Sequence, residues 1–246
     1  MKKSKYLVLN SFYFDFNDDL TEITNVKELF KKQNILDLFR FDKIKSITEY
    51  KFNGYNINFV YLPKNIEKIE YCAFYENQIQ ILDLSNCINL KNIGEFAFAE
   101  NQIKHLKLPD NIEEIYNYAF SKNQIEILDL SNCINLKVIN ETAFKENQIK
   151  HLKLPDNIEE IKWSAFLKNQ IKILDLSNCI KLKNIEKHAF EENPLNEIKI
   201  LDNINIEYYK YLKNDLWTKF VIYYNDTNKK SGDYKLENNE WKWYPL

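Results

Sequence analysis

The sequence repeats one phrase at a regular interval along most of its length. The dipeptide Ala-Phe occurs six times, with its phenylalanine at Phe74, Phe98, Phe120, Phe144, Phe166 and Phe190. The steps between copies are 24, 22, 24, 22 and 24 residues, so two unit types alternate. A period of about 20 to 29 residues predicts a stack of coils, because one such coil cannot bury its own apolar face.

Each unit predicts one short strand and one return segment. In the 24-residue unit 123–146 (NQIEILDLSNCINLKVINETAFKE), apolar and polar residues alternate, which places Leu128 and Leu130 in the core. The second half returns the chain with Ile139, Ala143 and Phe144 facing the same core. We expect the phenylalanines of the Ala-Phe pairs to stack into a continuous spine.

The repeat phrase has a recognisable form. It reads AF-x-x-N-x-I-x-x-L-x-L-P, with I-x-x-I before the next AF, and it resembles the BspA-like leucine-rich-repeat family over residues 55–214. The resemblance implies a right-handed curved solenoid that binds proteins, and members are often bacterial or protist surface proteins that attach to host proteins. This sequence departs from the family in lacking an evident signal peptide or anchor.

These features predict an α/β-type repeat solenoid. We expect a stack of leucine-rich coils with a parallel concave β-sheet, a mostly irregular or short-helical convex side, and three regions. Residues 1–54 form an N-terminal cap with degenerate coils, residues 55–214 the regular repeats, and residues 215–246 a small C-terminal β-meander cap.

The N-terminal region has two competing interpretations. A shift of 46 residues aligns Leu36 to Leu38 with the LDL of the regular units, and a second shift aligns Phe14 to Phe16. Residues 9–54 then form two worn coils, the first closed by a helical turn near Asn25-x-x-Glu28, which resembles a capping box. The alternative is a separate helical cap over residues 24–40.

Composition and charge narrow the class of protein. The formal net charge is −2, which argues against a nucleic-acid partner, and 45% hydrophobic residues allow a packed core. No apolar run approaches the roughly 18 residues of a membrane-spanning helix. The N-terminus lacks the long apolar stretch of a signal peptide, so we predict a cytoplasmic protein, with a cell-surface or secreted protein as the alternative. We also expect a monomer.

Three cysteines recur at the same place in the long unit. Cys87, Cys133 and Cys179 are two coils apart, about 10 Å, which exceeds the roughly 7 Å between Cα atoms that a disulfide tolerates. Asn111 and Asn157 hold the corresponding place in the intervening coils. We therefore predict an internal Cys–Asn column that meets backbone groups at the corner of each coil. The sequence has no C-x-x-C pair of the kind that binds zinc, and we expect no cofactor.

The central outward position of the strands alternates in charge. It reads, from coil to coil, Asp83, Lys107, Asp129, Lys153, Asp175 and Lys199. Opposite charges on adjacent strands attract, so we predict a structural ladder that keeps the coils in register. Lysine neighbours lower a carboxylate pKa, so these aspartates make a poor catalytic dyad. Ser131 and its copies, at strand ends, are expected to bond the turn.

The remaining candidates for function lie where the units differ. The outward residues Tyr13, Ile35, Phe59, Tyr61 and Ile81 predict an aromatic and apolar patch that either binds a partner or is covered by the N-terminal segment or a second copy. The three residues before each Ala-Phe also vary. Either these positions tolerate substitution, or they form a surface adapted to a partner. His105 and His151, about 10 Å apart, cannot share a metal unaided.

No catalytic constellation emerges from these patterns. The sequence predicts a non-catalytic module that binds a protein partner through its concave face or a flank. The alternative is a surface protein that attaches to host matrix proteins or glycans.

Overall fold

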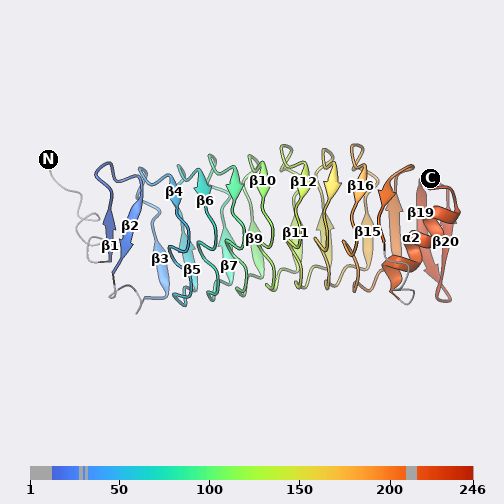
Figure 1. Ribbon diagram of the computed structural model, residues 1–246, viewed down its shortest axis with the longest axis horizontal. Coiled ribbons are helices and arrows are strands. Elements are labelled where there is room, and N and C mark those ends of the chain that lie inside the picture. Colours follow the sequence, from blue (N-terminus) through green and yellow to red (C-terminus); the bar gives the residue numbers. More distant parts are fainter. Residues whose placement is uncertain (1–12, 28–29, 31–32, 209–214, 246) are drawn as a thin grey trace.

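The chain forms a row of stacked coils. A computed structural model describes residues 13–27, 30, 33–208 and 215–245, and Figure 1 shows two rows of short strands that follow one another from the N-terminal to the C-terminal end. No helix in these described ranges is long and apolar enough to cross a membrane.

The first row of strands forms the first sheet. Its members are β3 (Ile35–Asp37), β5 (Phe59–Tyr61), β7 (Ile81–Asp83), β9 (His105–Lys107), β11 (Ile127–Asp129), β13 (His151–Lys153), β15 (Ile173–Asp175) and β17 (Glu197–Ile200). The strands are parallel, as predicted, and pair as β3-β5-β7-β9, β11-β13 and β15-β17. Ladder pairing is therefore interrupted between β9 and β11 and between β13 and β15.

The return segments carry a second row of strands, two residues each. These are β4 (Ser46–Ile47), β6 (Lys68–Ile69), β8 (Asn92–Ile93), β10 (Glu114–Ile115), β12 (Val138–Ile139), β14 (Glu160–Ile161), β16 (Asn184–Ile185) and β18 (Asn205–Ile206). They pair in parallel as β4-β6-β8-β10 and β12-β14-β16-β18. The convex side was expected to be mostly irregular or short-helical, and in the described return segments it is irregular, because each is a brief strand followed by hydrogen-bonded turns.

A spine of phenylalanines runs through the core, as predicted. Ring centroids of successive coils lie 5.1–5.7 Å apart from Phe52 to Phe190, and the rings are nearly parallel. Leu128, Leu130 and Phe144 are all fully buried or nearly so. Stacked rings are a favourable arrangement in addition to the area they bury, so every coil helps to order the next.

A ladder of buried asparagines stabilises the turn after each Ala-Phe pair. Its members are Asn77, Asn101, Asn123, Asn147, Asn169 and Asn193. Each side chain donates to the phenylalanine carbonyls of its own and the preceding coil, and accepts the N–H of an isoleucine in the preceding coil. The regular spacing of these asparagines is visible in the sequence, but spacing alone does not reveal which backbone groups they satisfy.

The N-terminal end is a hairpin rather than a coil. Strand β1 (Phe14–Phe16) pairs antiparallel with β2 (Ile23–Val26), which corrects the prediction of a first worn coil. Asn25 lies in β2 and donates to Asp15, so it caps no helix; Glu28 lies outside the described residues. The helical alternative over residues 24–40 is also wrong, because β2 and β3 occupy its two ends.

The second of the two predicted degenerate coils, which contains Leu36 to Leu38, is present. Strands β3 and β4 pair in parallel with β5 and β6 of the first regular coil. The hairpin covers the open end of the spine, where Phe14 and Phe30 contact Phe52 at centroid distances of 6.0 and 5.8 Å.

The C-terminal cap combines a helix with a hairpin. Helix α2 (Leu216–Asp226) precedes strands β19 (Gly232–Glu237) and β20 (Glu240–Tyr244), and β19 extends the first sheet antiparallel to β17 (Figure 1). The predicted β cap is confirmed for the hairpin, but residues 220–226 are helical. Trp217, Phe220, Val221 and Tyr224 recur at helical spacing and are buried, which explains the difference.

Two contacts anchor helix α2 to the last coils. The Asp215 carboxylate accepts the N–H groups of Trp217 and Thr218 and, with its other oxygen, that of Glu192. Trp217 packs on Phe190 at a centroid distance of 5.0 Å and closes the spine.

Candidate functional site

The outer face of the first sheet, where the first and third side chains of each strand meet solvent, carries an apolar stripe. Ile35, Phe59 and Ile81 occupy paired positions on β3, β5 and β7, and are 50%, 39% and 50% exposed. Tyr61 lies beside them on β5 and is 52% exposed. Tyr13 does not join this stripe, because β1 pairs with β2 and the Tyr13 ring packs against Phe30.

The same column changes character farther along the sheet. Ile127 and Ile173 are also exposed, but His105 and His151 occupy the strands that precede and separate them. Among the strands that the structure describes, the apolar stripe is therefore continuous only across β3, β5 and β7.

The charged column forms separate pairs, not one continuous ladder. Nζ–Oδ2 distances are 3.7 Å for Lys107 and Asp83, 3.2 Å for Lys153 and Asp129, and 4.0 Å for Lys199 and Asp175. Among the described residues, no ion pair joins Lys107 to Asp129 or Lys153 to Asp175. The predicted alternation therefore produces pairing only at the 24-residue steps, where the strands share ladder hydrogen bonds.

Each aspartate of these pairs also closes a turn. The Ser131 hydroxyl and N–H both donate to Oδ1 of Asp129, at 2.6 and 3.1 Å, as expected for a serine that bonds the turn. The Ser131 hydroxyl, opposed by burial, lowers the pKa of Asp129, and Lys153 adds to the effect. A carboxylate held ionised by a serine and a lysine stabilises the turn and is a poor proton acceptor for catalysis.

The cysteines and asparagines of the predicted internal column occupy different depths. Cys87, Cys133 and Cys179 are buried, and burial raises the pKa of their thiols to about 11, 11 and 12. Asn111 is exposed and Asn157 half-buried, and they donate to the carbonyls of Ile88 and Ile134 at 2.8 and 3.1 Å.

The prediction of one internal column is therefore wrong for the asparagines. In the preceding coil Cys133 contacts buried Pro109, whose carbonyl oxygen lies 3.8 Å from the sulfur. The 22-residue coil turns its corner with proline, which shifts its asparagine outward to bond the backbone of the coil before it.

A groove opens where ladder pairing fails between β13 and β15. It has a volume of about 630 Å³ and is lined by Lys150, His151, Leu152, Lys153, Gln170, Lys172, Ile173 and Asp175. Lys150 and Lys153 already pair with Glu126 and Asp129 of the preceding coil, which leaves Lys172 as the basic residue of the groove without an ion pair in the described structure.

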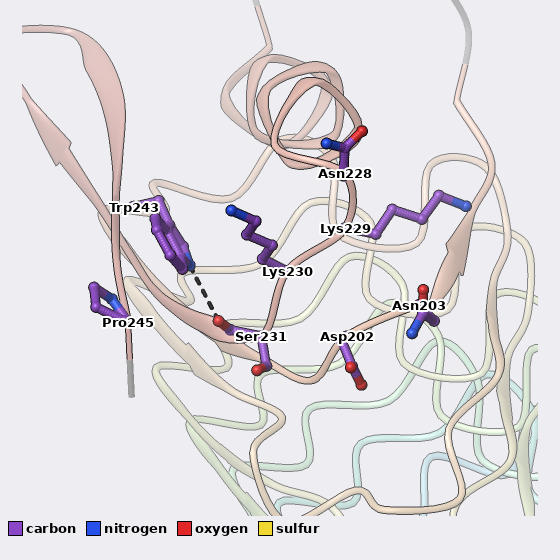
Figure 2. A pocket seen from close by; sticks show the side chains of 8 residues that line it. All are labelled: Asp202, Asn203, Asn228, Lys229, Lys230, Ser231, Trp243 and Pro245. Carbon is purple, nitrogen blue, oxygen red and sulfur yellow. Dashed lines mark hydrogen bonds between the residues drawn. The ribbon is translucent and has the colours of Figure 1, made fainter.

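A second hollow, of about 300 Å³, lies in the C-terminal cap. Figure 2 shows Trp243 beside Lys230, with the indole N–H donating to the Ser231 carbonyl at 3.0 Å. The Lys230 ammonium group lies 4.9 Å from the centroid of the Trp243 ring. The lysine already occupies the aromatic face, so this contact belongs to the cap itself.

Comparison with known families agrees with this architecture. The model of the BspA type leucine-rich repeat region matches six copies over residues 24–145 and 127–239. The chain belongs to the BspA-type leucine-rich repeat family. Family membership accounts for the Ala-Phe spine and the stacked parallel strands, and a chain of this family is a repeat scaffold. No curated protein matches the chain significantly.

Several solved structures are similar to the chain. A leucine-rich cell surface protein from Faecalibacterium prausnitzii A2-165 superposes with a TM-score of 0.63 at 20% identity, over 76% of this chain and 52% of that protein. The pneumococcal vaccine antigen PcpA gives 0.46 at 21% identity, over 66% and 50%. A leucine-rich repeat protein from Bacteroides ovatus ATCC 8483 gives 0.40 at 16% identity, over 79% and 65%. The chain spans half to two thirds of these proteins, and the first similarity shows the shared fold.

Proposed function

We propose that this repeat scaffold is a non-catalytic module that binds a partner protein through the outer face of its first sheet. The observation that supports the proposal is the continuous stripe of Ile35, Phe59 and Ile81 on three paired strands, with Tyr61 beside it. Single exposed apolar residues are common on protein surfaces, but a contiguous row with aromatic members is typical of an interface centre.

A matched pair of variants tests this proposal. Phe59→Ser/Tyr61→Ser removes the aromatic part of the stripe, and Ile127→Ser/Ile173→Ser removes side chains that are at least as exposed but lie outside the stripe, next to the histidine-bearing strand β13. In affinity capture from lysates, we expect partners retained by the wild type and the control to be lost with the stripe variant. Equal capture by both variants would contradict the proposal.

A second candidate function is attachment at the cell surface. It is favoured by the F. prausnitzii protein, which shares the fold and is described as a cell surface protein. Labelling of intact source cells with a membrane-impermeant reagent, with a cytoplasmic enzyme as the control, tests it. A chain that is labelled like a surface marker supports attachment, whereas strict retention with the cytoplasmic control would leave an internal scaffold.

A further inference from the structure

The two internal copies of the repeat pair differ mainly on one flank. Residues 77–122 and 123–168 differ at nine of 46 positions, and one of these, Gln80 against Glu126, precedes a strand of the first sheet. The other eight lie in the return half of the coils, at residues 92, 94, 96, 99, 116, 117, 118 and 121 of the first copy. Sequence change is therefore concentrated in the second strand row and the turns that follow it.

In the N-terminal coils those turns carry a connected row of aromatic rings, which we name the tyrosine flank: Tyr50, Tyr71, Tyr75, Phe96 and Tyr118. Centroid distances are 5.2 Å from Tyr50 to Tyr71, 6.1 Å from Tyr71 to Phe96 and 4.5 Å from Phe96 to Tyr118. Tyr75 contacts Phe96 at 6.2 Å. In the second copy, Thr142 and Ser164 stand in place of Phe96 and Tyr118, so the aromatic row ends there.

The backbone holds this row in register. The N–H of Tyr50 donates to the Tyr71 carbonyl, that of Cys72 to Glu95, and that of Phe96 to Asn117, so each turn rests on the next. The rings are not part of the core, since Tyr50 is 53% exposed and the other four are half-buried.

Two hollows open along the tyrosine flank and share Tyr71. The first, of about 280 Å³, is lined by Tyr50, Asn53, Tyr71, Cys72, Tyr75 and Phe96. The second, of about 360 Å³, is lined by Lys68, Ile69, Glu70, Tyr71, Asn92, Gly94, Glu95 and Tyr116. Aromatic residues therefore border both hollows: Tyr50, Tyr75 and Phe96 join Tyr71 around the first, and Tyr116 joins it around the second.

The charge around these hollows is predominantly negative. Glu49, Glu70 and Glu95 form no ion pair with any described residue, whereas Glu67 and Glu113 of the same coils are paired with lysines at 2.8 and 2.7 Å. Burial together with the nearby carboxylates of Glu95 and Glu49 raises the pKa of the Cys72 thiol, although Tyr71 opposes this shift. Lys68 is the one basic residue that lines either hollow.

We propose that the tyrosine flank binds a lysine- or arginine-rich segment of a partner protein. Ammonium and guanidinium groups are attracted to the faces of tyrosine and phenylalanine rings, and their charge complements the three unpaired glutamates. In an extended segment, alternate side chains lie about 7 Å apart on the same side. Two such side chains could therefore enter the two hollows that meet at Tyr71. The proposed surface lies in the return turns and does not depend on the stripe of the first sheet.

The internal duplication supplies a variant that should still fold. Phe96→Thr/Tyr116→Lys/Tyr118→Ser replaces three aromatic residues with those at the same positions of the second copy, where Thr142, Lys162 and Ser164 are accommodated. The probe is a fluorescein-labelled peptide of alternating lysine and serine, and the readout is fluorescence anisotropy at low and moderate salt. We expect the triple variant to weaken binding about tenfold or more. Thermal unfolding of each variant checks that it is folded.

Two further variants complete the test. Glu49→Gln/Glu95→Gln keeps the shape of the flank and removes charge, so it should weaken binding and flatten the salt dependence. Phe59→Ser/Tyr61→Ser in the first sheet should leave peptide affinity unchanged. The proposal is overturned if the wild type does not bind the lysine peptide, if a glutamate–serine peptide binds equally, or if the triple variant retains wild-type affinity. Loss of affinity in the first-sheet variant alone would assign the binding to the first sheet.

Discussion

The side-chain Nδ2 of Asn147 lies 2.9 Å from the carbonyl oxygen of Phe120 in the preceding coil. The same amide group donates to Phe144 of its own coil, and its Oδ1 accepts the N–H of Ile125. One buried side chain thus satisfies backbone groups of two coils that no strand pairing reaches. Neither aspartate nor glutamine offers this combination of donors, acceptor and reach, which explains why the position is asparagine in each of the six regular turns.

Replacing Asn147 with alanine should destabilise the protein by about 3 kcal/mol or more, because several buried backbone groups lose their partner. Gln148→Ala, at the exposed neighbouring position, is the control and should change the free energy of unfolding by less than about 0.5 kcal/mol. Urea denaturation followed by circular dichroism measures both. Similar midpoints for the two variants would show that the ladder contributes little.

Trp217→Ala should destabilise the C-terminal end by about 3–5 kcal/mol, because it leaves a cavity on the last ring of the spine. Trp163 provides the control, since it is 39% exposed and its ring makes only an edge contact with His188, so Trp163→Ala should have a small effect. Hydrogen exchange resolved along the chain measures where protection is lost. If Trp217→Ala left the last coils as protected as in the wild type, the spine would not need its cap.

The charge pairs predict selective rescue. Lys107→Asp places a carboxylate beside Asp83, and Asp83→Lys should restore the attraction, with a coupling energy of about 0.5 kcal/mol for this exposed pair. Asp129→Lys, on the other side of Lys107, should not restore it, because no ladder hydrogen bonds join β9 to β11. A double-mutant cycle on thermal stability separates the two. Rescue by Asp129→Lys would mean that the ladder is continuous after all.

The lowered pKa of Asp129 predicts a pH dependence of stability. The unfolded carboxyl titrates near pH 4 and the folded one lower, so the stabilising contribution is present above that value and is lost as the pH falls through the folded pKa. The difference in free energy of unfolding between the wild type and Asp129→Asn should therefore shrink from pH 7 to pH 3. Ser131→Ala should reduce the same pH dependence, and an unchanged difference at pH 3 would contradict the assignment.

The buried cysteines should be unreactive in the folded protein. With the pKa of the Cys87 and Cys133 thiols raised to about 11, only about one in a thousand is ionised at pH 8, and the thiolate is the reactive form. Titration with a chromogenic disulfide reagent should be slow without denaturant and rapid for all four thiols in urea. Fast reaction of the native protein would show that the coils open locally.

The repeat architecture could be predicted from the sequence because every coil repeats the same burial pattern. The alternation around Leu128 and Leu130 and the spacing of the Ala-Phe pairs follow from local periodicity, and the structure confirms the parallel strands and the stacked rings. At the C-terminal end Trp217, Phe220 and Tyr224 recur at helical spacing in the sequence, but the turn residues that follow them favour strands. The hairpin of β1 and β2 depends on pairing between segments, which a shift in alignment does not reveal.

Only the tertiary structure decided which neighbours interact. Sequence alternation put a lysine on either side of Asp129, yet backbone pairing exists on one side alone, so only Lys153 comes within reach. The same holds for Asn111, whose depth was set by the proline corner of its coil. It holds also for the tyrosine flank, whose contacting rings are 21 to 25 residues apart in the sequence. Periodicity determines which residues face inward, because burial is a property of each coil. Contacts between coils depend on how the backbones of two different coils pair, and that pairing is set only when the coils stack in the folded protein.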